Sequence, residues 1–320
     1  MDRLKQGGFY LLKSHALCQL QDLGRFGVAG LGLTEGGACD QQSAMLANML
    51  LGNVAGAPLL EIGVGGVSLR AQANTYISLT GAQMPFLING QPAPRYCTIA
   101  VQSGDLIEIG YARAGLRCYL AVAGGFLVPT TLGSVSTVLR EGVGGLNGGA
   151  LADGDWLAVH PCEAIALRSL PYESQPKFSA VTALDWIAGA QYDWFSQEAI
   201  TRLDQQLFRV TKQSDRMGCR LSGGKIKVKP QAQMYSEGVC CGAIQISNDG
   251  QPIVMLNDHQ TIGGYAKPGA VSRLSLNALA QCRPGSLVRF VKRDLCDVQA
   301  KAARQREWLA RLQQEWQHKA

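Results

Sequence analysis

Two carboxylates, Glu237 and Asp258, are the side chains whose type and setting best suit acid–base chemistry. Both lie in residues 235–269, where polar side chains alternate with glycines and short apolar runs. A carboxylate in such a loop can give or take a proton when it reaches the reacting group. His259 follows Asp258 directly and is interpreted as a structural hydrogen-bond donor. A simple succession of turns between strands is the alternative interpretation of this stretch.

Two arginines in glycine-bordered loops suit a small anionic ligand. Arg25 and Arg216 each lie close behind an aspartate. A guanidinium can hold a carboxylate or a phosphate through two parallel hydrogen bonds. The alternative is that each arginine pairs with a neighbouring carboxylate and fixes its own loop. Lys267 and Tyr265 could also hold an anion, beside Gly263 and Gly264.

The composition predicts the elements that position these residues. Glycine occurs 38 times, while only 17% of residues are charged and 7% are aromatic. Many turns between short strands would produce this balance. Residues 9–20 are expected to form a strand pair, and residues 74–160 show further short apolar runs separated by turns. We expect a mostly β (α+β) fold with two barrel-like halves, residues 1–165 and 166–320.

Three segments carry helix signals. Asp40 is a favourable N-cap for a helix over residues 41–51, and Ser196 for one over residues 197–204. From Asp297 onward, apolar residues recur at helical spacing, which predicts a C-terminal helix. Its apolar stripe is expected to dock on the chain's own body, and docking on a partner is the alternative.

Composition and motifs also argue against several functions. The net charge is +6, but no block of basic residues interleaved with aromatics indicates nucleic-acid binding. The chain has no 18-residue apolar run and no recognisable signal peptide, so a cytoplasmic protein without membrane contact is expected. Neither a phosphate-binding P-loop nor a dinucleotide fingerprint is present. The ten cysteines and four histidines form no zinc pattern, so no metal is expected and the cysteines are interpreted as small buried residues.

A series of motifs runs in order over about residues 9–295. The segments are Gln21–Arg25, Gly36–Asp40, Tyr119–Gly125, Ser214–Leu221, Glu237–Gly238 and Asp258–Tyr265. Taken together they resemble the KipA / allophanate hydrolase subunit 2 family, also called biotin-dependent carboxyltransferase-like. Each motif alone is common, and their shared order makes the resemblance specific.

The resemblance implies a cyclophilin-like β architecture and a place in an ATP-dependent 5-oxoprolinase. That enzyme is a hydrolase acting on a cyclic amide, and it opens 5-oxo-L-proline to L-glutamate. The implied partners are a KipI / allophanate hydrolase subunit 1-type protein and a LamB/YcsF-type subunit. ATP is expected in the complex and biotin is not. Activity is expected only when the subunits are assembled.

Such chemistry needs hydrogen-bond donors around phosphate and carboxylate groups and a base for water. On the resemblance, Glu237 and Asp258 are the predicted catalytic groups. The predicted substrate- or anion-binding residues are Arg216, Gln245, Gln260, Tyr265, Lys267 and Arg25.

Two departures from the family pattern weaken any anion site in the first half. Val135 and Gly149 stand where arginine is usual. Two other functions stay open. The chain could be the carboxyltransferase component of a biotin-dependent urea carboxylase or allophanate pathway. It has no biotin-carrier Met-Lys-Met motif, so biotin would come from another protein. It could also be a non-catalytic antagonist of a kinase-inhibitor partner.

Overall fold

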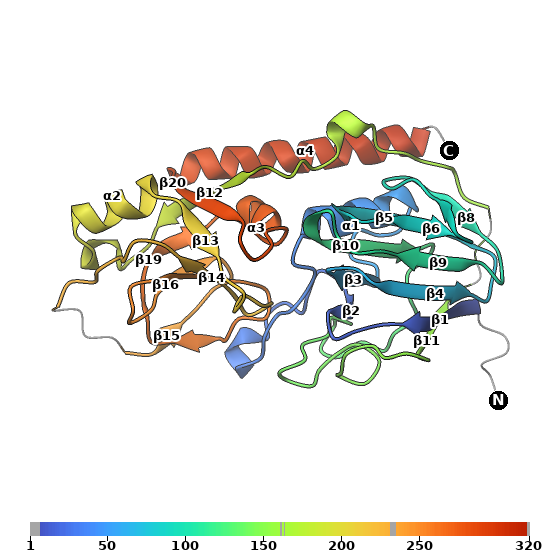
Figure 1. Cartoon of the computed structure of the whole chain (residues 1–320), viewed down its shortest axis with the longest axis horizontal. Coiled ribbons are helices and arrows are strands. Elements are labelled where there is room, and N and C mark those ends of the chain that lie inside the picture. The colour runs from blue at the N-terminus through green and yellow to red at the C-terminus, as the bar shows by residue number, and fades with distance from the viewer. Residues whose placement is uncertain (1–6, 161, 163, 231–234, 319–320) are drawn as a thin grey trace. The chain divides into compact units, whose positions relative to one another are not determined.

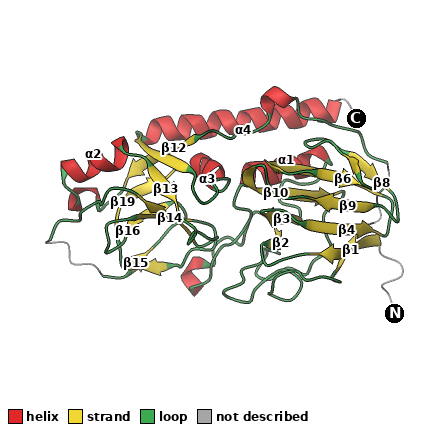
Figure 2. Ribbon diagram, in the orientation of Figure 1, coloured by secondary structure: helices red, strands yellow, loops and turns green. Residues whose placement is uncertain are grey.

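The computed structural model describes residues 7–160, 162, 164–230 and 235–318. Strands dominate this part of the chain, which contains four α-helices (Figure 2), so the predicted mostly β class is confirmed. The chain forms two compact units. Unit 1 comprises Met1–Phe26, Gly36–Lys177 and Leu312–Ala320, and unit 2 comprises Gly27–Glu35 and Phe178–Arg311. Residue 165, the division expected from the sequence, lies inside unit 1.

Unit 1 is built from two antiparallel sheets. One has six strands in the order β11 (Trp156–Val159), β1 (Gly7–Lys13), β4 (Val67–Ala71), β9 (Leu106–Ile109), β6 (Phe86–Ile88) and β7 (Gln91–Pro92). The other has five strands in the order β2 (Cys18–Gln21), β3 (Leu59–Gly63), β10 (Ala114–Val122), β5 (Thr75–Gln83) and β8 (Ile99–Val101). Alternate residues of both sheets, such as Phe9 and Ile62, turn inward and share one core.

The predicted strand pair over residues 9–20 is wrong in its pairing. Both strands exist, but β1 pairs with β4 and β11, whereas β2 pairs with β3 in the other sheet. The intervening turn is fixed by His15, whose Nε2 lies 2.7 Å from the carbonyl oxygen of Gly65. A tertiary contact therefore sets the direction of the chain between the two strands.

Helix α1 (Gln41–Leu50) confirms the first helix prediction. The Asp40 side chain accepts a hydrogen bond from the backbone nitrogen of Ser43 at 3.1 Å, as an N-cap should. The helix ends before Gly52, whose φ of 75° is costly for other residues. Its apolar side packs on β5 and β10.

Unit 2 is a closed barrel of seven strands (Figure 1). Their order around the barrel is β12 (Val181–Ala188), β19 (Ala266–Val271), β16 (Ala243–Ile246), β17 (Pro252–Met255), β14 (Gly218–Ser222), β13 (Phe208–Val210) and β20 (Leu287–Lys292). All neighbours are antiparallel except β12 and β20, whose parallel pairing closes the barrel. Inward side chains such as Trp186 and Phe290 fill its core. A separate ribbon pairs β15 (Glu237–Gly238) with β18 (Ile262–Gly263).

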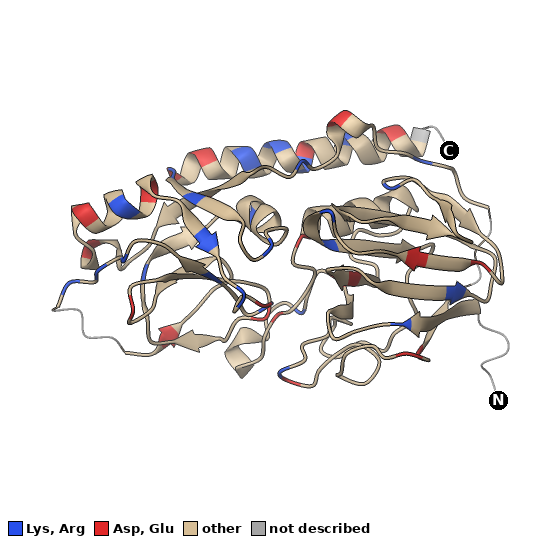
Figure 3. Cartoon of the chain, viewed as in Figure 1, with Lys and Arg blue, Asp and Glu red and all other residues tan. Residues whose placement is uncertain are grey.

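Three further helices and three short 3-10 turns complete the described elements. They are α2 (Gln197–Gln205), α3 (Arg273–Leu279), α4 (Leu295–His318), η2 (Ala29–Leu31), η3 (Tyr172–Ser174) and η4 (Tyr192–Trp194). The predicted cap at Ser196 is confirmed, because its hydroxyl accepts from the backbone nitrogen of Ala199. The predicted C-terminal helix is α4. Acidic and basic residues both occur along α2 and α4 (Figure 3).

Asp185 of β12 holds the first part of α4 in unit 2. Its carboxylate accepts hydrogen bonds from Arg293 at 2.9 Å and from Lys301 at 2.5 Å. Although partial burial opposes the shift, these two cations hold the pKa of Asp185 below its ordinary value. Farther along α4, Leu312 and Trp316 are buried, as expected of a stripe that docks on the chain's own body.

The ten cysteines form no disulfide bond. The prediction that they are small buried residues is confirmed for Cys18, Cys39, Cys118, Cys219 and Cys282. It is wrong for Cys240 and Cys296, which are exposed. Burial raises the pKa of Cys18 to about 12 and so keeps its thiol neutral.

Candidate functional site

The predicted residues of the 235–269 stretch lie mainly on the outer face of the barrel in unit 2. Ile244 of β16 points into the barrel core, so the next residue, Gln245, points outward. Ala266 of β19 is also in the core, which turns Lys267 outward. Because β16 and β19 are hydrogen-bonded neighbours, Gln245 and Lys267 share one face of the sheet.

The β15–β18 ribbon lies directly on this face. Val239, immediately after β15, packs with outward apolar residues of β16 and β17, and Tyr265 packs against the same cluster. A β-carbon on Gly263 would lie 3.0 Å from Cγ2 of Val239 and 2.4 Å from Nε2 of Gln245. Glu237 is the register partner of Gly263. The ribbon therefore brings Glu237 to the face that carries Gln245.

Glu237 is the centre of a polar cluster with Lys267 and Gln191. Its Oε1 accepts hydrogen bonds from Nζ of Lys267 and from Nε2 of Gln191. Oε1 of Gln191 in turn accepts from the backbone nitrogen of Lys267 at 2.8 Å. The Glu237 side chain is 46% exposed and that of Lys267 is 15% exposed. Both bonds fall on one carboxylate oxygen of a half-exposed side chain, so the described residues leave the other oxygen for water or a ligand.

Arg216 and Asp258 form a buried, two-point ion pair. Nε of Arg216 is 2.8 Å from Oδ2 of Asp258, and Nη2 is 2.9 Å from Oδ1. Their side chains are only 10% and 9% exposed. Arg216 precedes β14 and Asp258 follows β17, and the pairing of these strands brings the two loops together. The expected partner of Arg216, the adjacent Asp215, instead accepts from the backbone nitrogens of its own turn.

The two predicted glutamines flank Gly263. Gln245 is 2% exposed, and its Nε2 has no hydrogen-bond partner among the described residues. The position that a β-carbon of Gly263 would take lies 2.4 Å from Nε2 of Gln245 and 3.2 Å from Nε2 of Gln260. Two primary amides therefore converge on a point that only a glycine leaves open.

Arg25 is placed differently from the other predicted binding residues, because it belongs to unit 1. It is 1% exposed, and its Nη2 donates to the carbonyl oxygen of Ser136 at 2.6 Å. Nε points to the carbonyl oxygen of Thr131 at 3.5 Å. The nearby Asp22 accepts hydrogen bonds from Ser134 and Ser136. These contacts tie residues 131–136 to the loop that carries Asp22 and Arg25.

His259 and Cys241 make contacts typical of structural residues. Nδ1 of His259 lies 2.8 Å from the carbonyl oxygen of Gln260, and the His259 carbonyl oxygen accepts from the hydroxyl of Thr34. Burial raises the pKa of Cys241, whose sulfur lies 3.3 Å from Nη1 of Arg273. The Cys241 thiol is therefore kept neutral.

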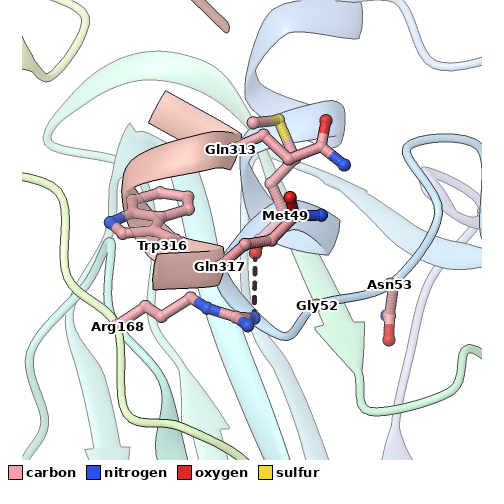
Figure 4. A pocket seen from close by; sticks show the side chains of 7 residues that line it. All are labelled: Met49, Gly52, Asn53, Arg168, Gln313, Trp316 and Gln317. Atoms are coloured by element: carbon pink, nitrogen blue, oxygen red, sulfur yellow. Dashed lines mark hydrogen bonds between the residues drawn. The ribbon is translucent and has the colours of Figure 1, made fainter. Parts of the chain in front are cut away.

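Unit 1 contains a cavity of about 70 Å³ beside the end of α1 (Figure 4). Nη1 of Arg168 donates to the carbonyl oxygen of Met49 at 3.4 Å, which places positive charge at the C-terminal end of the helix. The lining residues are Met49, Gly52, Asn53, Arg168, Gln313, Trp316 and Gln317. This volume suits a few water molecules, each of which takes about 30 Å³ in the liquid.

Neither a metal-binding cluster nor a membrane-spanning helix occurs among the described residues. No group of three or more histidine, cysteine, aspartate or glutamate side chains in that part of the chain is placed to hold a metal ion. No helix found there is both long and apolar enough to cross a membrane.

Gln191, which donates to Glu237, is not among the site residues predicted from the sequence. It lies 46 residues before Glu237, in the turn that leads into η4, and its side chain is largely buried. No motif or spacing connects it to Glu237 in the sequence. The barrel brings them together because Gln191 follows β12, and β12 pairs with the strand that carries Lys267. Only the strand order reveals this contact.

The chain is similar to known proteins over most of its length. A model of the carboxyltransferase domain, subdomains A and B, matches residues 31–292. Two curated proteins, each named as the C subunit of 5-oxoprolinase, are close to it in length and sequence. The one from Haemophilus influenzae is 34% identical over 278 residues, which is 85% of this chain and 86% of that protein. The one from Escherichia coli is 33% identical over 282 residues, which is 88% of this chain and 90% of that protein.

A solved structure extends this similarity to the fold. The crystal structure of the Kluyveromyces lactis urea carboxylase matches with a TM-score of 0.90 and 27% identity. The match covers 96% of this chain and 29% of that protein. This chain therefore corresponds to one segment of the larger urea carboxylase.

Proposed function

The chain belongs to the carboxyltransferase domain family, and we propose that it is one of the subunits of an ATP-dependent 5-oxoprolinase. The observation that carries the proposal is the match, along most of both chains, to two proteins named as 5-oxoprolinase subunits. The proposed reaction opens the lactam ring of 5-oxo-L-proline to give L-glutamate. The assembly is expected in the cytoplasm, where ATP is available.

We assign Glu237 and Lys267 the central chemical roles. In the ATP-dependent reaction the γ-phosphoryl group of ATP would be transferred to the lactam oxygen. Water would then add to the carbonyl carbon, and the ring C–N bond would break with a proton left on the nitrogen. A second water would release phosphate from the carboxyl group. One oxygen of Glu237 is held by Lys267 and Gln191, and the other can take a proton from the attacking water. The ammonium of Lys267 stabilises negative charge that develops on the carbonyl oxygen. Asp258 would have to leave its ion pair with Arg216 before it could act as a base.

The described residues do not form a triphosphate site by themselves. Lys267 and Arg216 are the cations of the candidate site, and each already binds a carboxylate. A phosphate would have to compete with those carboxylates. We therefore place ATP mainly with the partner subunits, which we expect to be of the KipI type and the LamB/YcsF type. On this proposal the isolated chain has little activity, because part of its site is supplied by a partner.

The structural match to the urea carboxylase favours a second candidate function. In that case the chain would transfer a carboxyl group from biotin carried by another protein. The shared fold supports this alternative at the level of architecture. It is less specific than the sequence match, because this chain spans only 29% of the urea carboxylase.

A reconstitution with and without this chain tests the main proposal. The three subunits are purified, mixed with ATP and 5-oxo-L-proline, and glutamate formation is followed. We expect glutamate formation to require all three subunits. A rate that is unchanged when this chain is omitted would overturn the proposal. Carboxylation of urea that depends on an added biotinylated carrier, with no glutamate formed, would favour the second candidate.

A further inference from the structure

The amide nitrogen of Gln245 is a buried donor that the described residues leave unused. Gln245 is 2% exposed, and its Nε2 has no hydrogen-bond partner there. Leaving a polar group buried and unsatisfied is unfavourable, and native structures contain few such groups. The apolar cluster of Val239, Ala243, Ile253 and Met255 lies on the same face of the barrel. An unused donor in such a setting calls for an acceptor that the described residues do not provide.

We propose that Nε2 of Gln245 is reserved for an oxygen of the substrate, namely the carbonyl or carboxylate oxygen of 5-oxo-L-proline. This inference rests on the proposed function and specifies how the substrate is recognised. The second amide, that of Gln260, flanks the same point beside Gly263 and can serve a second oxygen. Glu237 is the register partner of Gly263, so the reserved donor lies close to the proposed base.

The lack of a side chain at Gly263 leaves room for the Gln245 amide. A β-carbon at Gly263 would lie 2.4 Å from Nε2 of Gln245, which is too close for any real contact. The amide would have to move to accommodate an alanine. At the next residue, Gly264, the nearest atom to an added β-carbon is Oγ of Ser236 at 3.7 Å, an ordinary contact. The two neighbouring glycines therefore provide a matched pair of variants.

Access to the donor requires the ribbon to move. Nε2 of Gln245 is enclosed in the free chain, and Gly263 of β18 lies against it. Two residue pairs join β18 to β15, and Glu237, Gly238 and Ile262 are exposed. Val239, the residue after β15, is buried in the apolar cluster, so only a small displacement of the ribbon is expected. The substrate oxygen reaches Gln245 when the ribbon shifts outward just enough to admit it, with Gly263 still beside the amide.

Binding of 5-oxo-L-proline to the assembled complex of all three subunits, measured by calorimetry without ATP, tests this inference. We expect Gln245→Met and Gly263→Ala each to weaken binding about tenfold, the loss expected for one hydrogen bond. Gln206→Met and Gly264→Ala should bind as the unmodified complex does. Gln206 suits this control because both ends of its amide already bind Gly224.

Stability gives a second readout that a purely structural glutamine would not produce. Replacing the unsatisfied amide by an apolar side chain of similar size should raise the Tm of the isolated Gln245→Met chain by about 2–4 °C. Gln206→Met should leave the Tm unchanged or lower it, because it removes hydrogen bonds that are made.

Two results would overturn the inference. The first is equal binding by the unmodified and Gln245→Met complexes. The second is no binding of 5-oxo-L-proline by the unmodified complex, since no oxygen of that compound would then reach Gln245. Failure of the proposed function is seen separately, as glutamate formation that continues when this chain is omitted.

Discussion

Each unit of the molecule holds a carboxylate in a polar cluster, but the two clusters differ in exposure. In unit 1, Glu61 is 3% exposed, and its Oε2 accepts from the backbone nitrogen of Cys39 and the hydroxyl of Tyr119. Arg117 lies 3.5 Å from its other oxygen. In unit 2, the Glu237 side chain is 46% exposed, and both of its hydrogen bonds fall on one oxygen.

On the proposed function, this difference separates a structural carboxylate, Glu61, from a catalytic one, Glu237. The Tyr119 hydroxyl that binds Glu61 also accepts from the backbone nitrogen of Asp40, the N-cap residue of α1. Glu61 therefore stabilises the start of a helix and is closed to solvent. Glu237 is half exposed, and the described residues donate hydrogen bonds to only one of its two oxygens. It also lies near Gln245, whose amide nitrogen has no partner among the described residues. The exposure of Glu237 and the second oxygen that the described residues leave open distinguish the candidate site from the cluster around Glu61.

The largest stability effect is expected at Glu61. Glu61→Ala removes one partner of a buried ion pair and the carboxylate to which Arg117 and Tyr119 bind. We expect the free energy of unfolding to fall by about 3–5 kcal/mol. The matched change Glu237→Ala should cost less than about 1 kcal/mol, because the Glu237 side chain is half exposed. Urea unfolding followed by circular dichroism measures both, and equal losses would refute the comparison.

A smaller loss is expected at the buried ion pair of unit 2. Arg216→Lys keeps the charge but cannot make both bonds to Asp258 in the same geometry. We expect the free energy of unfolding to fall by about 1–3 kcal/mol. Arg202→Lys is the control, because Arg202 forms an exposed pair with Glu198 that should contribute less than about 0.5 kcal/mol. If both variants unfold at the same urea concentration, the pair does not stabilise the site.

Gln191 should affect catalysis more than stability. Gln191→Leu removes the amide that joins Glu237 to the backbone of Lys267. We expect kcat of the assembled enzyme to fall about tenfold, or about 1.4 kcal/mol, with KM little changed. Gln206→Leu should leave kcat unchanged, and Gln191→Glu should not restore it, because a carboxylate cannot donate to Glu237. A rise in KM alone would show that Gln191 serves binding instead of positioning.

The smallest effect concerns the tyrosines of unit 1. Burial, together with nearby Glu61 and Asp40, raises the pKa of Tyr119 well above its usual value. Burial also raises the pKa of Tyr96 to about 12. Because the folded-state pKa values are raised, their contribution to stability is complete below about pH 10 and is lost as the pH rises further. Ultraviolet absorbance of tyrosinate at about pH 11 should show two tyrosines that titrate only on unfolding. Their ionisation in the folded chain would mean that the cluster is open to solvent.

The sequence predicts local features of this fold well. The helix caps at Asp40 and Ser196 depend on contacts within one turn of helix, so they can be identified from adjacent residues. The glycine-rich composition and the short apolar runs similarly indicate a mostly β chain. The order of motifs is specific enough to identify the family from the sequence.

The sequence cannot predict contacts that depend on strand order. Adjacent residues suggest Asp215 as the partner of Arg216, yet Asp258 reaches it through the pairing of β14 with β17. Gln191 reaches Glu237 only through the pairing of β12 with β19, the strand that carries Lys267. Arg25 has the same sequence setting as Arg216 but is enclosed by the carbonyl groups of residues 131–136. Which partner each arginine binds is decided by where the fold buries it, and that depends on the whole chain.

Glutamate formation by the complex rebuilt with the Glu237→Gln chain tests the central claim most directly. Glutamine keeps the size of the side chain and its contact with Lys267, but it cannot take a proton from water. We expect kcat to fall at least about 100-fold while the complex assembles normally. A Glu237→Gln complex that forms glutamate at the rate of the unmodified enzyme would contradict the claim that the barrel face of unit 2 is the working site.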